Sequence, residues 1–294
     1  MSKYKKLLGY TLFAVIMCCF FLYIFFPFET LRQFLEGSIT KISPELSLKI
    51  DSLRPALPFG LKLENTDLRH DSEPQIPFFE ADVVLLIPSI LTIIQRKPII
   101  QFACGAYGGK LHGTFTSKTF SLKGPFESDI HITGVRLGQY PMLKEKLKRK
   151  CSGAMNGTIT CKFGQEGLLE GSGTASFSIV DGKVNFIQPF LGMEAVDFKR
   201  IDVNMKLINR TIFLDELSFE GKQVEATGNG TVRLNRHFER SGLNIIVQIK
   251  PLSDFLGANN GIFDAAQLFI NQLKKDKFSL KIHGTIAQPR FNFI

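Results

Sequence analysis

The longest uninterrupted apolar stretch lies close to the start of the chain. Leu7 to Phe26 contains no charged residue, and Lys3, Lys5 and Lys6 precede it. About 20 residues at about 1.5 Å each cross a hydrocarbon core of roughly 30 Å. Because basic flanks stay on the cytoplasmic side, the pattern predicts a transmembrane signal anchor, with everything after Pro27 outside the cytoplasm.

Two alternatives compete with a retained anchor: a buried core helix, which would not be apolar on all sides over this length, and a cleaved signal peptide. Such peptides have a shorter apolar region that ends in a small-residue cleavage site. Here the apolar run ends in Phe25-Phe26-Pro27-Phe28, with no small residues spaced for cleavage. We therefore expect a cytoplasmic leader at residues 1–6 and a retained anchor at residues 7–27.

An amphipathic segment follows the predicted anchor. Between Phe28 and Ile42, apolar residues recur near helical spacing, at Phe28, Leu31, Phe34, Leu35 and Ile39. This predicts a linker helix at residues 28–43 whose apolar stripe faces lipid or the body of the protein. Ser43-Pro44 ends the helix, since a residue before proline disfavours the helical conformation.

From residue 44 onward the hydrophobic period changes to simple alternation. Leu46, Leu48 and Ile50 alternate with polar residues, which is typical of half-buried strands. The same pattern predicts strands at residues 61–64, 79–87, 99–107, 110–116, 121–123, 128–135, 157–163, 168–180, 183–187, 201–208, 211–219, 224–234, 243–249 and 278–282. Tight turns are expected at Gly108-Gly109, Asp181-Gly182, Asn209-Arg210 and Glu220-Gly221-Lys222.

Three short helical patterns interrupt the predicted strands. They are Ile90 to Ile94, Leu137 to Lys150 and Ile262 to Lys274. The first is either a plug under a sheet or a surface contact with lipid. The second is rich in lysine and is either a membrane-surface or partner-docking helix, or a solvated helix with a favourable cationic C-terminus. The third carries one apolar face.

Gly-Thr pairs recur where strands are predicted to open. They are Gly113-Thr114, Gly157-Thr158, Gly173-Thr174, Gly230-Thr231 and Gly284-Thr285. Their irregular spacing argues against a strict solenoid. Glycines permit bends and close strand approach, so the pairs suit a long, curved antiparallel sheet. Because few helices exist to cover it, the sheet must fold over on itself, close partly or bind something apolar.

We therefore expect a mainly β fold. A single N-terminal transmembrane helix precedes an elongated, curved, largely antiparallel sheet at residues 44–294, shaped as a groove or partly closed, with a few short helices. Of the 294 residues, 44% are hydrophobic and 28 are Phe, which excludes wholesale disorder and predicts an apolar inner face.

The charge balance bears on the partners of the protein. Lys and Arg number 36 against 27 Asp and Glu, which gives a net charge of +9. This modest excess favours contact with an anionic lipid surface. It is too dispersed for nucleic acid, which needs a clustered basic face, so no nucleic-acid partner is expected.

The cysteines leave the disulfide question open. Cys18 and Cys19 lie inside the predicted anchor and act as small apolar residues. Cys104, Cys151 and Cys161 lie in the exported part, so at most one bridge forms within a chain. Cys151 with Cys161 and Cys104 with Cys151 are both candidate pairs, and three buried thiols are an equal alternative.

The sequence contains no recognisable catalytic or metal-binding arrangement. The histidines lie scattered, most of them at polar strand positions: His70, His112, His131, His237 and His283. No metal-ligand or C-x-x-C spacing is present. We therefore expect no enzyme, with no catalytic residues, no cofactor and no metal.

Several glycine motifs are explained by local structure or by chance and do not indicate a functional site. Gly228-Asn229-Gly230 lacks the third glycine of a nucleotide loop, and Gly171-Ser172-Gly173 lacks the flanks of a nucleophile elbow. Asn156-Gly157-Thr158 and Asn229-Gly230-Thr231 match a glycosylation sequon. Asn-Gly is also the favoured hairpin turn, which explains both without a glycan.

The order of several weak motifs suggests a family. Thr227 to Asn235 (TGNGTVRLN) is followed by Ser241 to Asn244, then Ile249 to Leu252, and the chain closes with Ile282 to Pro289. With the basic leader, the apolar run and the β-rich body, this order resembles the type II secretion system protein N (GspN) family, which is related to AsmA-like proteins.

The resemblance implies a bitopic inner-membrane protein of a Gram-negative bacterium, with a periplasmic domain attached to the secretion apparatus. AsmA-like relatives carry elongated sheets with a hydrophobic groove and are linked to lipid traffic between membranes. The family defines no catalytic or binding residues, so none carry over.

Two functions follow as expectations. The leading one is a non-enzymatic, inner-membrane-anchored periplasmic component or assembly factor of a type II protein secretion system, with membrane lipid and other secretion subunits as partners. The alternative is an AsmA-like lipid-binding or lipid-transfer protein that holds acyl chains in a groove of the sheet. Both place the protein in the bacterial inner membrane, single-pass, with a cytoplasmic N-terminus and a periplasmic body.

Overall fold

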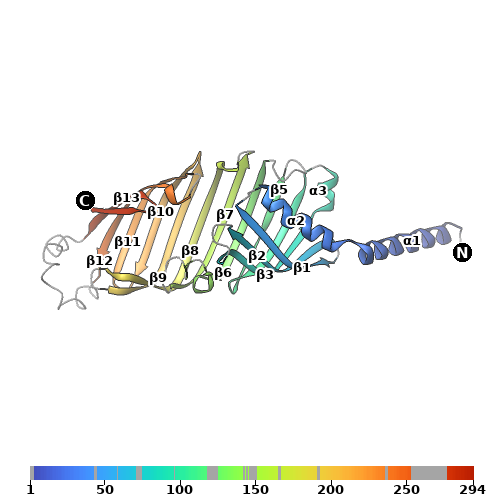
Figure 1. The fold of residues 1–294 in the computed structure, drawn as a ribbon, viewed down its shortest axis with the longest axis horizontal. Coiled ribbons are helices and arrows are strands. Elements are labelled where there is room, and N and C mark those ends of the chain that lie inside the picture. Colours follow the sequence, from blue (N-terminus) through green and yellow to red (C-terminus); the bar gives the residue numbers. More distant parts are fainter. Residues whose placement is uncertain are drawn as a thin grey trace.

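One antiparallel sheet makes up the body of the protein. The computed structural model describes residues 3–42, 45–57, 59–70, 75–95, 97–117, 125–141, 143, 145, 151–164, 167–190, 193–235, 238–252 and 277–294. Fourteen strands follow one another in the open sheet in chain order, from β1 to β14. The sheet is elongated, with the N-terminal helices at one end and the C-terminus at the other (Figure 1). The expected mainly β, antiparallel fold with few short helices is confirmed.

The elements have the following bounds. The helical elements are α1 (Lys3–Phe25), α2 (Phe28–Ile42), α3 (Ile90–Ile94), η1 (Leu137–Gln139) and η2 (Phe238–Arg240). The strands are β1 (Leu46–Ala56), β2 (Gly60–His70), β3 (Pro77–Pro88), β4 (Ile99–Ala106), β5 (Gly109–Ser117), β6 (Phe126–Arg136), β7 (Cys151–Gly164), β8 (Gly167–Phe190), β9 (Met193–Ile208), β10 (Thr211–Gly221), β11 (Val224–Arg233), β12 (Gly242–Pro251), β13 (Phe278–Thr285) and β14 (Pro289–Phe293).

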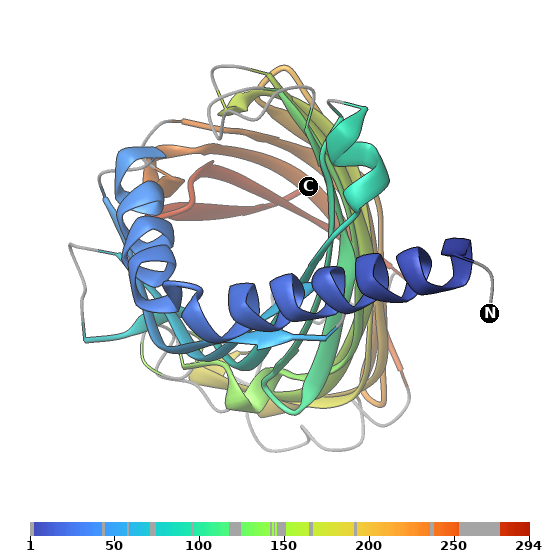
Figure 2. The ribbon, with the colours of Figure 1, turned by 90° about the vertical axis from the view of Figure 1, so that its right-hand side faces the viewer.

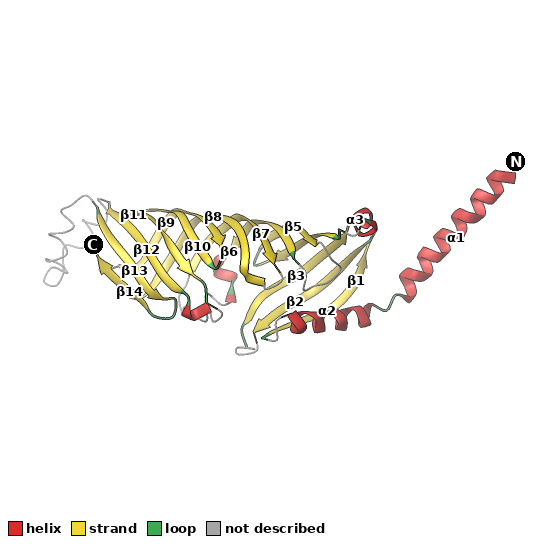
Figure 3. Cartoon of the chain, turned by 90° about the horizontal axis from the view of Figure 1, so that it is seen from above, coloured by secondary structure: helices red, strands yellow, loops and turns green. Residues whose placement is uncertain are grey.

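The sheet is strongly curved. Viewed along its length, the strands curve around a common axis, and α2 lies along one side of the curve (Figure 2). The helix α1 extends away from the β1 end of the sheet (Figure 3). It covers most of the residues of the predicted anchor.

Among the described residues, no helix combines the length and the hydropathy that a membrane span requires. The transmembrane helix expected at residues 7–27 is therefore not confirmed.

The linker helix predicted at residues 28–43 is confirmed as α2, which packs on the first strands. Phe28, Leu31 and Leu35 pack against a buried cluster of Ile50, Leu53 and Leu63. The apolar stripe of α2 therefore faces the body of the protein.

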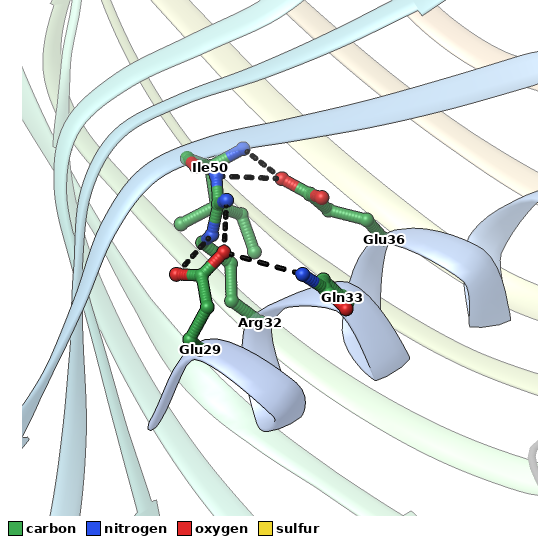
Figure 4. A network of polar contacts seen from close by, with 5 residues as sticks. All are labelled: Glu29, Arg32, Gln33, Glu36 and Ile50. Atoms are coloured by element: carbon green, nitrogen blue, oxygen red, sulfur yellow. Dashed lines mark hydrogen bonds and ion pairs between the residues drawn. The ribbon is translucent and has the colours of Figure 1, made fainter. Parts of the chain in front are cut away.

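Polar contacts hold α2 to the backbone of β1. Arg32 donates from Nη1 to the carbonyl oxygen of Ile50 at 2.7 Å, and the Ile50 N–H donates to Glu36 Oε1 at 2.9 Å (Figure 4). Arg32 also pairs with Glu29, and this hydrogen bond lowers the pKa of the Glu29 carboxyl from its ordinary value. Because Ile50 lies in an edge strand, these contacts occupy backbone groups that another strand would otherwise pair with.

Three of the four predicted turns need correction. The turn after β4 is Tyr107-Gly108, with φ of 51° and 70°, because Ala106 already pairs with Gly109. Asp181-Gly182 is no turn but lies inside β8, where Gly182 pairs with Phe198. A Cβ on Gly182 would lie 2.1 Å from the Phe198 ring, so the glycine serves close packing.

The last two turns connect β9, β10 and β11. Asn209-Arg210 is confirmed, with φ of 46° and 66°. The turn predicted at Glu220-Gly221-Lys222 lies slightly later, since Gly221 still belongs to β10 and β11 begins at Val224.

The Asn-Gly pairs and the Gly-Thr pairs also lie elsewhere than expected. Asn156-Gly157 lies inside β7 and Asn229-Gly230 inside β11, so explaining these pairs as hairpin turns is wrong. The five Gly-Thr pairs lie within strands rather than opening them. Their two residues project to opposite faces of the sheet, because side chains alternate along a strand.

No disulfide forms among the described cysteines. Cys104, Cys151 and Cys161 are all free thiols, so neither candidate pair forms. The alternative of three unpaired thiols holds, with Cys104 buried and the other two half-buried. Cys151 and Cys161 lie on one continuous strand, β7. Ten residues of strand separate them by about 33 Å, whereas a bridge needs Cα atoms within about 7 Å.

Several predictions fall wholly or partly outside the described residues. These are the strand at residues 121–123, the helix at Ile262 to Lys274, His237 and most of the helix at Leu137 to Lys150. From the last, residues 137–139 form η1, and residues 141, 143 and 145 are helical.

Gly157→Ala tests the close approach of strands at the glycine positions. A Cβ on Gly157 would lie 2.6 Å from Cδ1 of Phe177 and 2.7 Å from the carbonyl oxygen of Ser176. Such overpacking costs about 1–3 kcal/mol of unfolding free energy, measurable by urea denaturation. Gly105→Ala is the matched control, since a Cβ there meets nothing within 4 Å. Equal losses in the two variants would contradict this packing.

Candidate functional site: a continuous apolar face

Strand register shows how side chains line up across the sheet. Residues directly opposite each other on antiparallel strands present their side chains on the same face. Following these partners from Pro55 in β1 gives a row with one residue from every strand, and every member is apolar or glycine. The first row is Pro55, Leu61, Leu86, Phe102, Gly113, Ile130, Ile159, Ala175, Met205, Leu214, Gly230, Ile245, Ile282 and Phe291.

A second row runs beside the first on the same face. It too takes one residue from each strand, and its members are apolar, glycine or cysteine. The second row is Leu53, Leu63, Val84, Cys104, Leu111, Ile132, Gly157, Phe177, Val203, Leu217, Gly228, Val247, Leu280 and Phe293. We call the two rows together the apolar face.

Further apolar residues widen the apolar face across the later strands. Beside the second row, from β6 to β13, lie Val135, Met155, Ile179, Ile201, Phe219, Ala226, Ile249 and Phe278. Beside the first row, from β9 to β12, lie Leu207, Ile212, Val232 and Leu243. The surface is about 62 Å long by strand spacing, and about 20 Å wide where four rows lie side by side. A typical monomer exposes no contiguous apolar patch above a few hundred Å².

The opposite face of the sheet is polar. One residue away from the first row, the ladder runs through Gln101, Thr114, Asp129, Thr160, Thr174 and Lys206. His112 and His131 stack on this face with ring centroids 5.1 Å apart, as expected for histidines at polar strand positions. The sheet is therefore amphipathic across its thickness.

Glycines under aromatic rings indicate which side of the curved sheet is apolar. A Cβ on Gly113 would lie 2.9 Å from the Phe102 ring, and one on Gly157 would meet the ring of Phe177. Side chains crowd together on the inner side of a bent sheet, and glycines relieve that crowding. The apolar face therefore lies on the concave side of the curve in Figure 2.

The apolar face is shielded unevenly. In the second row, Cys104, Ile132, Val247 and Leu280 are buried, although α2 packs only near the first strands. The first row is partly exposed along its whole length, and Phe291 at its end is 57% exposed. Neighbouring side chains on a concave surface thus shield one another, while the first row stays open to contact.

The apolar environment also affects the thiols on this side of the sheet. Burial raises the pKa of the Cys104 thiol, and it does the same for Cys161, which lies opposite Ser128. Both thiols therefore stay protonated and poorly reactive near neutral pH.

No charged side chain belongs to either row. Over the described ranges, no group of three or more His, Cys, Asp or Glu could hold a metal ion. A surface of this kind can hold hydrocarbon by removing it from water. The arrangement fits an apolar ligand.

The sequence pointed to an apolar inner face but not to its continuity. Alternation within each strand shows which residues share a side, yet the alignment of one strand with the next depends on register. Comparisons with known proteins found no matching family model, no matching curated protein and no matching solved structure.

Proposed function

We propose that the protein binds the acyl chains of lipids along the apolar face, next to a membrane. The observation that carries the proposal is the pair of uncharged rows through all fourteen strands. This is the lipid-binding function that the sequence left as an alternative.

Continuity of the rows is what acyl-chain binding needs. Each methylene that leaves an apolar environment for water costs about 0.8 kcal/mol. A polar or charged residue in one strand would interrupt the contact of a chain that crosses it. From Pro55 to Phe291 no such interruption occurs in the first row.

The helix α1 would bring this surface to lipid. It carries Lys5 and Lys6 near its N-terminus and exposes large apolar side chains such as Leu8 and Phe13. We propose that residues 7–27 anchor the protein in a bacterial inner membrane, with residues 1–6 cytoplasmic and the sheet periplasmic. This topology can be tested with cysteines introduced at residues 3 and 215. The measurement is whether a membrane-impermeant thiol reagent reaches each of them in intact cells.

Native mass spectrometry of the gently extracted full chain tests lipid binding. We expect a stoichiometric phospholipid that survives extraction and is lost on unfolding. A protein that leaves the membrane without lipid, and that takes none up from phospholipid micelles, would exclude the proposal.

A role in type II secretion is a second proposal, and it rests on sequence. The motifs Thr227 to Asn235 and Ile282 to Pro289 carry it. The sheet would then serve as a non-enzymatic component or assembly factor attached to other secretion subunits. Pull-down of the intact, anchored chain should recover such subunits, and recovery of none would count against this role.

A further inference from the structure

A second group of apolar side chains lies outside the apolar face, at one end of the first strands. Leu57 and Phe59 in the β1–β2 turn are 83% and 62% exposed, and Ile90 and Leu91 in α3 are 44% and 73% exposed. We call these four residues the apolar tip. Nothing among the described residues buries them.

Strand pairing brings the four residues of the apolar tip to the same end of the sheet. Ala56 pairs with Gly60 on either side of the β1–β2 turn. Leu61, the next residue of β2, pairs with Leu86 near the end of β3. The helix α3 follows β3 directly, so the β1–β2 turn and α3 lie at the same end of these strands.

The α3 part of the apolar tip is held in place by hydrogen bonds through Thr92. Its hydroxyl donates to the carbonyl oxygen of Ser89 at 2.8 Å and accepts from the Ile99 N–H at 3.2 Å. Its carbonyl accepts from the Lys97 N–H at 2.9 Å. The exposure of Ile90 and Leu91 is therefore a fixed feature of the connection between β3 and β4.

The apolar tip lies at the end of the sheet that carries α1 and α2. The helix α2 packs on β1, and α1 precedes it directly in the chain. Figures 1 and 3 show α3 at this same end. A membrane that receives α1 would therefore face the apolar tip.

Basic residues flank the apolar tip. Arg54 and Lys62 lie beside the β1–β2 turn and both pair with Glu64, at 3.7 Å and 2.7 Å. Lys97 follows α3 and is exposed. Basic groups thus outnumber acidic ones around the apolar tip, as suits the headgroups of an anionic membrane.

We infer that the apolar tip inserts into the headgroup region of an anionic lipid bilayer. Moving a large apolar side chain out of water is favourable, so the four together hold the β1 end of the sheet on the membrane surface. The role of this contact rests on the proposed function, because it places the start of the apolar face against the lipid to be bound.

Depth-dependent fluorescence quenching on the full chain tests the inference. The native cysteines are first replaced, and an environment-sensitive fluorophore is attached to a cysteine introduced by Leu57→Cys or by Leu91→Cys. Each labelled protein is reconstituted into nanodiscs of phosphatidylethanolamine and phosphatidylglycerol. We expect a blue shift and quenching by nitroxide-labelled lipid. Asn209→Cys, in the exposed turn between β9 and β10, is the control and should respond to aqueous iodide instead.

Two outcomes would overturn the inference. If iodide quenches the probes at Leu57 and Leu91 as strongly as the probe at Asn209, the apolar tip stays in water. Tip probes shielded from both quenchers would show that a protein surface covers it.

A double variant separates this inference from the proposed function. Leu57→Ser with Leu91→Ser should fold normally, because both side chains are exposed, and should keep its bound phospholipid in native mass spectrometry. It should take up lipid from anionic vesicles several-fold more slowly than the unmodified chain. An unchanged uptake rate would overturn the inference, whereas absence of bound lipid in the unmodified chain would overturn the proposed function alone.

Discussion

Ala175→Asp should weaken lipid binding by about a hundredfold. Ala175 lies in the first row between Ile159 and Met205, near the middle of the sheet. A carboxylate in hydrocarbon costs about 2.5–3.5 kcal/mol, and each 1.4 kcal/mol is a tenfold change in affinity. With an acyl chain bound over the first row, this carboxylate would lie against hydrocarbon instead of water. Titration of the full-length protein with a fluorescent fatty acid measures the affinity.

Thr174→Asp is the matched control for this prediction. It introduces the same charge at the next residue, on the polar face, where Thr160 and Lys206 are the cross-strand neighbours. Affinity should stay within about twofold of the unmodified chain, since an exposed carboxylate beside a lysine costs little. Comparable loss in the two variants would mean that the acyl chains do not contact the first row.

Ile50→Ala should destabilise the β1 end of the sheet more than any other change considered. Ile50 is 0% exposed and packs with Leu53 and Leu63 in the cluster that α2 covers. Truncation of a fully buried isoleucine costs about 2–5 kcal/mol through lost burial and a residual cavity. Denaturant unfolding followed by circular dichroism gives the change in unfolding free energy.

Ile246→Ala is the control for the loss of side-chain area alone. Ile246 also lies in a strand, β12, but is 39% exposed and projects from the polar face, opposite Asn229. Its truncation should cost well under the loss at position 50. If the two variants lose the same stability, the packing of α2 on β1 contributes little.

The sequence was sufficient for the elements whose pattern is local. Phe28 to Ile42 shows helical spacing over four turns, and the structure has α2 over the same residues. The alternation of Leu46, Leu48 and Ile50 likewise predicted a strand with one apolar side. Fold class followed because nearly every segment after residue 44 alternates and few carry a helical period.

What the sequence could not supply was the register between strands. Ile50 and Leu53 are three residues apart, so strict alternation would place them on opposite faces, yet both belong to one buried cluster. The opposing strand has Asn65 at a φ of 48°, which marks a local irregularity. A register shift separates Leu214 from Leu217 in β10, so both lie on the apolar face although they are three residues apart. The two rows therefore stay continuous through β10.

Glycine gave the most misleading local signals. Asp181-Gly182 and Asn156-Gly157 have the composition of tight turns. In the structure both pairs lie inside strands, where Phe198 and Phe177 occupy the space that a Cβ would need. The Gly-Thr pairs combine a glycine on the apolar side with a threonine on the polar side, so they indicate an amphipathic, curved sheet rather than strand starts.

Photocrosslinking would locate the bound acyl chain on the sheet residue by residue. The full chain, loaded with a phospholipid that carries a diazirine in its acyl chain, is irradiated and digested, and the modified residues are located by mass spectrometry. We expect adducts along the first row from the early strands to the late ones, at residues such as Leu86, Ile130, Met205 and Ile282. Adducts confined to α1, or spread equally over polar-face residues such as Thr114 and Thr174, would contradict it.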